Sequence, residues 1–364
     1  MKWSLYIGKI SGIKVFLHWT LLIFLLWIGI NAFRAEQKIN EMYNSILFMV
    51  SIFVCVLLHE LGHSITAKKL GYETKNITLL PIGGVAQMSE IPEKPKHELI
   101  VALAGPSVNI VIGSILLPIG LYFNHISSID FTKINSPGSF LFNLIAVNFS
   151  LAFFNLIPAF PMDGGRVLRA FLAWRSGNRV KATQTASNLG KILSVVFFVI
   201  GVFFNPMLSL IGVFIFFMAH SENEIVKSKN LLKEYTAKDV VMKTFHTLNS
   251  HHKVSDAVNL LLNVQATDFL IMENEKVAGT LSRDNIISAL SKNGSDTLLT
   301  EAMNKNFRSV DIQTELDSIY PAIMANGNNI IPVYDQGKLT GIIDGQNILE
   351  FLLIKTAGKI KEGY

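Results

Sequence analysis

Residues 54–71 of the chain read VCVLLHELGHSITAKKLG, an apolar run that ends in a polar motif and two lysines. On a helix, residues four positions apart share a face, so His59 and His63 can bind one metal ion. Glu60 lies one position further round, where a carboxylate can act as general base towards water. Neutral imidazoles suit Zn²⁺, and catalytic zinc sites use three protein ligands and one open position. The stretch predicts a catalytic metal site; the alternative is a solvated helix face.

The motif lies in an apolar segment, residues 46–67, that is long enough to cross a bilayer as a helix. Ionisable groups near the centre of such a helix cost about 2.5–3.5 kcal/mol each, so their presence indicates a functional site. Together with five further apolar runs, this segment predicts a polytopic α-helical membrane protein with six spans. The other runs are residues 15–32, 99–123, 140–160, 192–204 and 207–219. A re-entrant hairpin is the alternative for the last two, because only Asn205 and Pro206 separate them.

Composition divides the chain between membrane and water. Its 364 residues are 50% hydrophobic and 16% charged, with a mean hydropathy of +0.40, which excludes a purely soluble globular protein. Residues 1–220 hold 17 Lys and Arg against 9 Asp and Glu, a net charge of +8, whereas residues 221–364 hold 15 against 18, a net charge of −3. Basic residues gather before the first run and after the second and fourth, which predicts cytoplasmic termini and a cytoplasmic C-terminal part. No basic stripe indicates nucleic-acid binding.

A third ligand is expected at the cytoplasmic end of another span. The run 140–160 leads into FFNLIPAFPMDGGR, residues 153–166, in which two prolines break the helix. Broken backbone at membrane depth is tolerated where it lines a protein-enclosed or watery cavity. Both spans run from outside to inside, so Asp163 is expected at the depth of His63. The alternative is that Asp163 only caps the helix that follows it.

Taken together, these motifs resemble those of a known family. His-Glu-x-x-His on one helix and Asn-x-x-Pro-x-x-x-x-Asp-Gly on another resemble the site-2 protease family of intramembrane zinc metalloproteases. SGIKVFLHW at residues 11–19 and AGPSVN at residues 104–109 are similar to further stretches of that family. The resemblance covers roughly residues 10–220.

The resemblance implies one Zn²⁺ per chain, held by His59, His63 and Asp163, with Glu60 as general base. It also implies that the enzyme cleaves a membrane-spanning segment of a partner protein, commonly after another protease has trimmed that partner.

Four further polar residues of this part have weaker assignments. Asn109 and Asn155 are both candidates to orient the substrate or to stabilise the developing oxyanion, and their spacing does not choose between them. His18 is expected to be a structural histidine. Cys55 is the single cysteine, so it forms no intrachain disulfide, and we expect it to pack between helices.

The segment YETKNITLLPIGGVAQM, residues 72–88, predicts a short β-hairpin or edge strand beside the metal. An exposed strand edge can pair with a substrate backbone and hold it extended, which exposes carbonyls that a helix keeps in internal hydrogen bonds. The alternative is a linker that skims the membrane surface.

The C-terminal part contains an internal repeat with a period of 61–62 residues. VMKTFHTLNSHHKVSDAVNLLL from residue 241 parallels AMNKNFRSVDIQTELDSIYPAI from residue 302, and Gly279 parallels Gly341. Each copy alternates helical and short β segments, and two copies suit a pseudo-twofold pair rather than a solenoid. The repeat resembles a tandem of cystathionine-β-synthase-type (CBS) domains, which are soluble α/β modules. The expected domains are residues 1–220 (membrane protease), 221–235 (linker), 236–296 and 297–356 (the two CBS copies).

The resemblance to CBS pairs implies an adenine nucleotide bound between the copies. Asp284 stands where the family commonly keeps a ribose-binding carboxylate, whereas the second copy carries Gln346 there. The alternative is a scaffolding module without a ligand, which forms a homodimer.

Two rival functions remain at this stage. A CBS-regulated transporter or channel would spread its polar residues through the depth of the bilayer, whereas here they cluster at one end of the spans. An inactive homologue that binds membrane partners would not need the complete set of motif residues.

Overall fold

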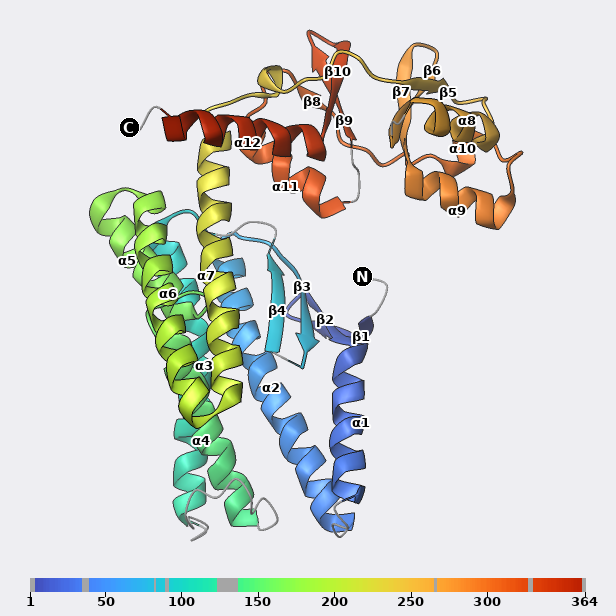
Figure 1. Ribbon diagram of the computed structural model, residues 1–364. Helices are drawn as coiled ribbons and strands as arrows, with labels where there is room; N and C mark the ends of the chain where they lie inside the picture. The colour runs from blue at the N-terminus through green and yellow to red at the C-terminus, as the bar shows by residue number, and fades with distance from the viewer. Residues whose placement is uncertain are drawn as a thin grey trace. The chain divides into compact units, whose positions relative to one another are not determined.

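The computed structural model in Figure 1 describes residues 4–34, 39–81, 83–88, 92–122, 137–264, 267–326 and 330–361. The last residue of the predicted run 99–123 and Ile82 of the predicted hairpin lie outside them. The chain divides into two compact units, Met1–Glu224 and Ile225–Tyr364.

The helices of the first unit carry its membrane character. Four helices are long and apolar enough to cross a membrane: α2 (Ile39–Lys69), α3 (Pro95–Tyr122), α6 (Arg179–Phe204) and α7 (Pro206–Leu232), the last of which continues past Glu224 into the second unit. The remaining described helices of this unit are α1 (Trp19–Arg34), α4 (Pro137–Leu156) and α5 (Asp163–Ser176). The apolar parts of α1 and α4, residues 19–31 and 140–156, are shorter than the four long helices. The unit is therefore that of a multi-pass membrane protein.

One predicted helix boundary is wrong. The run 15–32 begins in a strand, because residues 13–18 pair with a strand on either side, and Ile13 and Val15 are buried while Lys14 between them is exposed. The run 140–160 ends as a helix at Leu156, which confirms the predicted break at the prolines, because Pro158 disfavours helical backbone in the residue before it. Helices α6 and α7, by contrast, meet at Asn205 and each is long enough to cross a membrane.

A mixed sheet of four strands packs on α2. Its strands are β1 (Ser4–Ile10), β2 (Ile13–His18), β3 (Thr74–Leu80) and β4 (Gly83–Met88), in that spatial order. Strand β2 runs parallel to β3, while β1–β2 and β3–β4 are antiparallel pairs. Ile13 and Ile77 on two of these strands pack with Leu61 of α2 in one buried cluster. The segment expected to hold a hairpin therefore forms β3 and β4, whereas the sequence analysis missed β1 and β2.

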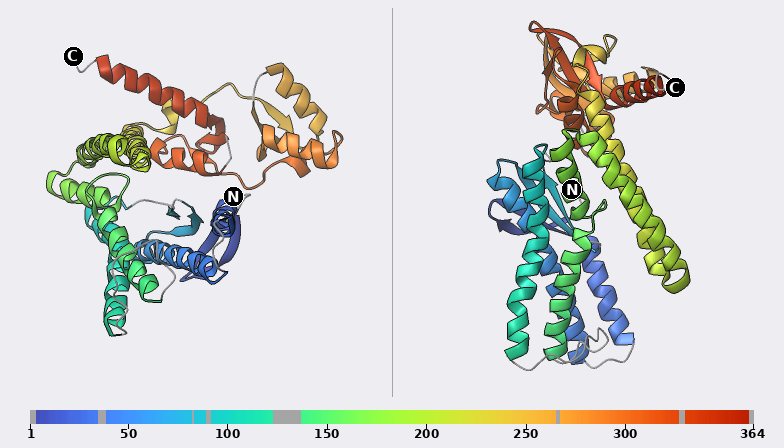
Figure 2. Two further views of the ribbon diagram at one scale, coloured as in Figure 1. Left: turned by 60° about the horizontal axis from the view of Figure 1, so that its bottom comes forward. Right: turned by 90° about the vertical axis from the view of Figure 1, so that its left-hand side faces the viewer.

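Helix α3 packs closely against α2 on one side and α4 on the other. A Cβ atom added at Gly62 of α2 would lie 2.8 Å from Val108 Cγ2 and 2.9 Å from the Ala104 carbonyl oxygen, so the two backbones approach closely. Figure 2 shows α3, in teal, beside α4, in green. This packing brings the AGPSVN segment of α3 next to the His-Glu-x-x-His motif.

The second unit contains two copies of one α/β arrangement. The first copy has β5 (Thr247–Asn249), α8 (Val254–Val264), β6 (Asp268–Glu273), β7 (Lys276–Ser282) and α9 (Arg283–Asn293). The second has β8 (Val310–Asp311), α11 (Leu316–Asn326), β9 (Ile330–Asp335), β10 (Lys338–Asp344) and α12 (Gly345–Lys361). The two sheets share their register as well, because Ile271 faces Gly279 in the first and Val333 faces Gly341 in the second.

The segment that precedes the first strand of each copy pairs with the last strand of the other copy. Met242 exchanges two backbone hydrogen bonds with Ile342 of β10, at 2.8 and 3.0 Å, and Asn304 exchanges two with Thr280 of β7, at 2.8 and 3.1 Å. The repeated glycines make these crossings possible. A Cβ at Gly279 would lie 3.0 Å from the Asn304 carbonyl oxygen, and one at Gly341 would collide with the Met242 carbonyl oxygen.

The hydrophobic cores follow the same exchange. Ala237 and Val240 belong to the buried cluster of the second copy, with Leu316 and Ile343. Leu299 belongs to the cluster of the first copy. Residues 236–296 and 297–356 are therefore repeats in sequence, but neither range contains a complete core.

Candidate metal centre

Two histidines and one aspartate converge on one buried point in the first unit. His59 Nε2 and His63 Nε2 lie 3.1 Å apart, and Asp163 Oδ2 lies 3.2 Å from the first and 3.1 Å from the second. The three residues are 6%, 4% and 9% exposed. The i, i+4 spacing on α2 supplies the histidines, and the first residue of α5 supplies the aspartate.

The segment between α4 and α5 brings Asp163 to this point. A Cβ at Gly164 would collide with the carbonyl oxygens of Leu156 and Ile157, and one at Gly165 would lie 2.5 Å from the Phe160 nitrogen. The two glycines therefore let the chain fold back tightly on the end of α4. The N-cap of α5 is Met162 and has no side-chain capping bond, so Asp163 is the first helical residue and its carboxylate faces the histidines instead.

Hydrogen bonds behind the rings decide which nitrogen of each histidine faces the cluster. His63 Nδ1 lies 2.7 Å from the Val101 carbonyl oxygen, and His59 Nδ1 lies 2.5 Å from Asn109 Oδ1. Both partners accept, so both Nδ1 atoms carry the proton and both Nε2 atoms present a lone pair. Those lone pairs face each other and the Asp163 carboxylate, so the cluster offers three donor atoms to one cation.

The donor set and its dimensions fit zinc. Two imidazole nitrogens and one carboxylate oxygen are a common ligand set of catalytic zinc sites. Tetrahedral ligands at bonds of about 2.0–2.1 Å stand about 3.3 Å apart. The observed separations of 3.1–3.2 Å are close to that value.

Two glycines line the cluster, and both were missed as site residues. A Cβ at Gly105 of α3 would lie 2.7 Å from His59 Nε2 and would overlap the His63 ring. A Cβ at Gly84 of β4 would lie 3.2 Å from Glu60 Cδ and would collide with Glu60 Cγ. The backbone of β4 therefore passes directly beside the Glu60 carboxylate, which itself is half-buried.

The two candidate asparagines occupy different surroundings. Asn109 is fully buried and uses its amide on His59 and on Asn148, whose Oδ1 accepts at 2.9 Å. It therefore lies behind the His59 ring, on the Nδ1 side. Asn155 is half-buried in the last turn of α4 and donates to the Leu151 carbonyl oxygen at 2.9 Å. Asn148 was missed, although an amide within an apolar run was a signal for it.

The remaining predicted residues lie outside the cluster. Cys55 is buried, and its Sγ lies 3.4 Å from Asn148 Nδ2. His18 Nδ1 lies 2.8 Å from Thr20 Oγ1. In the second unit, Asp284 is exposed in the first turn of α9, and its counterpart Gln346 is exposed and donates to Glu350 Oε1 at 3.1 Å.

A buried network of ion pairs, which the sequence analysis also missed, contacts residues 157–162, the segment before Asp163. Arg169 of α5 is 1% exposed and donates from Nε to Glu98 Oε1 of α3 at 2.8 Å, and from Nη1 to Glu222 Oε1 of α7 at 2.5 Å. Its guanidinium lies 4.9 Å from the centre of the Phe160 ring. The network links α3, α5 and α7 to this segment.

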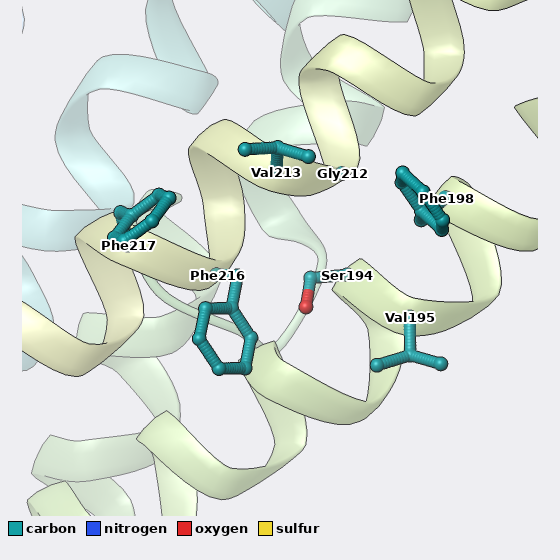
Figure 3. A pocket seen from close by; sticks show the side chains of 7 residues that line it. All are labelled: Ser194, Val195, Phe198, Gly212, Val213, Phe216 and Phe217. Atoms are coloured by element: carbon teal, nitrogen blue, oxygen red, sulfur yellow. The ribbon is translucent and has the colours of Figure 1, made fainter.

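An apolar groove elsewhere offers no comparable chemistry. Figure 3 shows it between α6 and α7, with Ser194 and Phe198 from one helix and Gly212 and Phe216 from the other. Its volume is about 200 Å³, and none of its lining residues is titratable.

A membrane-helix fold whose buried His₂Asp cluster adjoins a carboxylate and a strand defines a metalloprotease of the site-2 type. The sequence model of Peptidase family M50 matches residues 47–134 and 118–200, and that of the CBS domain matches residues 237–292. A zinc metalloprotease of Methanocaldococcus jannaschii is 35% identical over 357 residues, which cover 97% of each chain. The chain therefore belongs to peptidase family M50 and is a zinc metalloendopeptidase.

Two further similarities cover part of the chain. Stage IV sporulation protein FB of Bacillus subtilis is 33% identical over 121 residues, which cover 33% of this chain and 38% of that protein. The solved site-2 protease from Methanocaldococcus jannaschii is 39% identical, with a TM-score of 0.45, over 61% of this chain and 95% of that one.

Proposed function

We propose that the enzyme hydrolyses peptide bonds within transmembrane segments of other membrane proteins, with one zinc ion held by His59, His63 and Asp163. The observation that carries the proposal is the cluster of two lone-pair nitrogens and a carboxylate, buried in a membrane unit beside the free carboxylate of Glu60. When bound, zinc supplies Lewis acidity, which polarises a peptide carbonyl and eases the deprotonation of water near neutral pH.

The chain's own residues would move the proton and stabilise the developing charge. Glu60 accepts the proton of the attacking water and returns it to the leaving amine. Asn155, rather than Asn109, is the candidate donor to the oxyanion, because Asn109 is fully buried behind His59 with both ends of its amide bonded, whereas Asn155 is half-buried and has a second N–H beside the one that it donates to Leu151. Asn155→Ala should then lower the cleavage rate about 10²–10³-fold at unchanged zinc content. An unchanged rate would remove Asn155 from the mechanism.

The substrate would lie extended along β4, as the predicted hairpin suggests. Strand β4 is the last strand of the described sheet, and Gly84 packs against Glu60. A peptide that adds to this edge offers its carbonyls next to the general base instead of in helical hydrogen bonds.

The test of the function is cleavage in a membrane. The full chain, reconstituted in vesicles with a single-span substrate, should cut inside the apolar segment, as mass spectrometry of the products would reveal. A chelator should stop the reaction and added zinc should restore it. N-methyl groups on the backbone beside the scissile bond should slow cleavage if the substrate pairs with β4. Cleavage confined to soluble parts of the substrate, or unaffected by zinc removal, would contradict the proposal.

We also propose six spans with both termini and the CBS pair in the cytoplasm. Support comes from the four long apolar helices, from the apolar segments 19–31 and 140–156, and from the lysines and arginines that lie before the first span and after the second and fourth. Thiol labelling of single cysteines placed in these loops, in intact cells, would reveal any loop on the wrong side. The rival hypothesis of a transporter or channel predicts ion flux across the membrane of vesicles that contain the Glu60→Gln variant.

The CBS pair is proposed to bind an adenine nucleotide and to change the cleavage rate. One effective site per pair is expected, since Asp284 offers a carboxylate to ribose hydroxyls and Gln346 does not. Regulation further requires that the nucleotide favours one arrangement of the pair over another, because equal affinity shifts no population.

Calorimetric titration of the full chain with ATP, ADP and AMP should detect one site per pair. Asp284→Ala should weaken binding at least about tenfold, since a hydrogen bond to a charged group contributes about 1.5–3 kcal/mol. Gln346→Ala is the matched control at the equivalent position and should change binding far less. No heat with any nucleotide would favour a scaffolding module and a homodimer, which light scattering would detect.

A further inference from the structure

Three hydrogen bonds connect the ring of His59 to the backbone of α4. His59 Nδ1 lies 2.5 Å from Asn109 Oδ1, Asn109 Nδ2 donates to Asn148 Oδ1 at 2.9 Å, and Asn148 Nδ2 donates to the Leu144 carbonyl oxygen at 2.9 Å. Asn109 and Asn148 are both 0% exposed. Bulk water therefore does not compete for these amide atoms.

The direction of this chain of bonds is decided at its far end. A backbone carbonyl only accepts, so the atom of Asn148 that faces Leu144 is its nitrogen, and its oxygen faces Asn109. Asn109 must then present its nitrogen to Asn148 and its oxygen to His59. Cys55 Sγ, a weak acceptor 3.4 Å from Asn148 Nδ2, is compatible with the same orientation.

We infer that Asn148 is a positioning residue of the metal centre, which acts through Asn109 to keep the proton of His59 on Nδ1 and its lone pair on Nε2. The inference rests on the zinc site of the proposed function. His63 needs no such relay, because its Nδ1 meets the Val101 carbonyl oxygen directly.

The hydrogen-bonded chain from Asn148 through Asn109 to His59, here called the relay, matters because the oxygen and the NH₂ group of an amide are similar in shape and can exchange places. With an apolar residue at position 148, nothing would hold the nitrogen of Asn109 away from His59. A reversed Asn109 amide offers a donor to His59 Nδ1, which must then accept, and the ring proton moves to Nε2, where it points at the metal. Partners of this kind typically change metal affinity 10–100-fold.

The test is the zinc dissociation constant of the full chain in detergent, measured by competition with a chelating indicator, with thermal unfolding as the check on folding. Asn148→Leu should raise the dissociation constant 10–100-fold. Ser187→Ala is the matched control, because it removes another buried hydrogen bond to a backbone carbonyl, from Ser187 Oγ to Ala219 at 2.6 Å, and should leave the constant unchanged.

A rescue distinguishes the relay from mere packing. Asn109→Asp replaces the amide by a group with two accepting oxygens, so its orientation no longer matters once position 148 is apolar. With Asn148 still present, a carboxylate oxygen would face the Asn148 oxygen, and Asn109→Asp alone should therefore bind zinc more weakly than the native chain. Asn109→Asp combined with Asn148→Leu should instead bind zinc at least about tenfold more tightly than Asn148→Leu alone. A packing role predicts no such recovery.

Each outcome decides the inference. Native affinity in Asn148→Leu, or a double variant no better than that single one, would overturn it. If Asn148→Leu does not fold, the comparison of the double variant with the native chain decides alone: a zinc affinity within about tenfold of native supports the inference, and a loss of more than about 100-fold refutes it. A native chain that binds no zinc would overturn the proposed function as well, whereas the Asn148 variants bear on this inference alone.

Discussion

Glu60→Gln is expected to lower the rate of peptide cleavage about 10³-fold while the chain keeps its zinc. The substitution preserves the size of the side chain and removes its basicity, so water loses the group that would accept its proton. Glu60 is not among the three residues whose donor atoms converge. Replacing the Glu60 carboxylate by an amide should therefore leave the three converging donor atoms in place.

The measurement is cleavage of the reconstituted single-span substrate, together with zinc content by mass spectrometry. Glu73→Gln is the matched control, because Glu73 is an exposed glutamate just before β3 and should leave the rate unchanged. A Glu60→Gln variant that cleaves at nearly the native rate would refute the protease mechanism. A variant that loses zinc would instead reassign Glu60 to the ligands.

The second large effect concerns the ligands themselves. His59→Ala, His63→Ala and Asp163→Ala should each weaken zinc binding by more than about 100-fold. That value is the upper end of the loss in metal affinity when a residue that only hydrogen-bonds to a ligand is replaced. Each change leaves two donors, and two donors form a weak chelate. Because all three side chains are buried, the remaining polar atoms would also lack a partner.

Zinc per chain, measured after dialysis against a weak chelator, should fall close to zero in all three variants. His220→Ala, an exposed histidine of α7, and Cys55→Ala, a buried thiol that is not part of the cluster, should both retain the metal. Full occupancy in Asp163→Ala would mean that another residue supplies the third ligand.

Part of this site could be predicted because it depends on local periodicity. His59 and His63 share a helical face wherever a helix forms, and their apolar surroundings identify that helix. The repeat around Gly279 and Gly341 was likewise visible, because the same crossing of backbones imposes a glycine on both copies.

Other features could not be predicted, because they join elements that are distant in sequence. The strand β2 lies at the start of an apolar run; its pairing with β1 is local, but its pairing with β3 joins residues some sixty positions apart. The exchange of leading segments between the CBS copies also depends on long-range pairing. A repeat in sequence carries no information about which copy each segment packs against.

By itself, the sequence determined the His-Glu-x-x-His motif, the long apolar helices and the paired repeat, since spacing and hydropathy act within single elements. Only the tertiary structure decided what surrounds the two histidines. His59 meets Asp163 across 104 residues, Asn109 across 50, and Asn109 meets Asn148 across 39. Those contacts exist because α2, α3, α4 and α5 pack together. The direction of the hydrogen bond between Asn109 and Asn148 is defined only because Asn148 also donates to the Leu144 carbonyl oxygen, which can only accept.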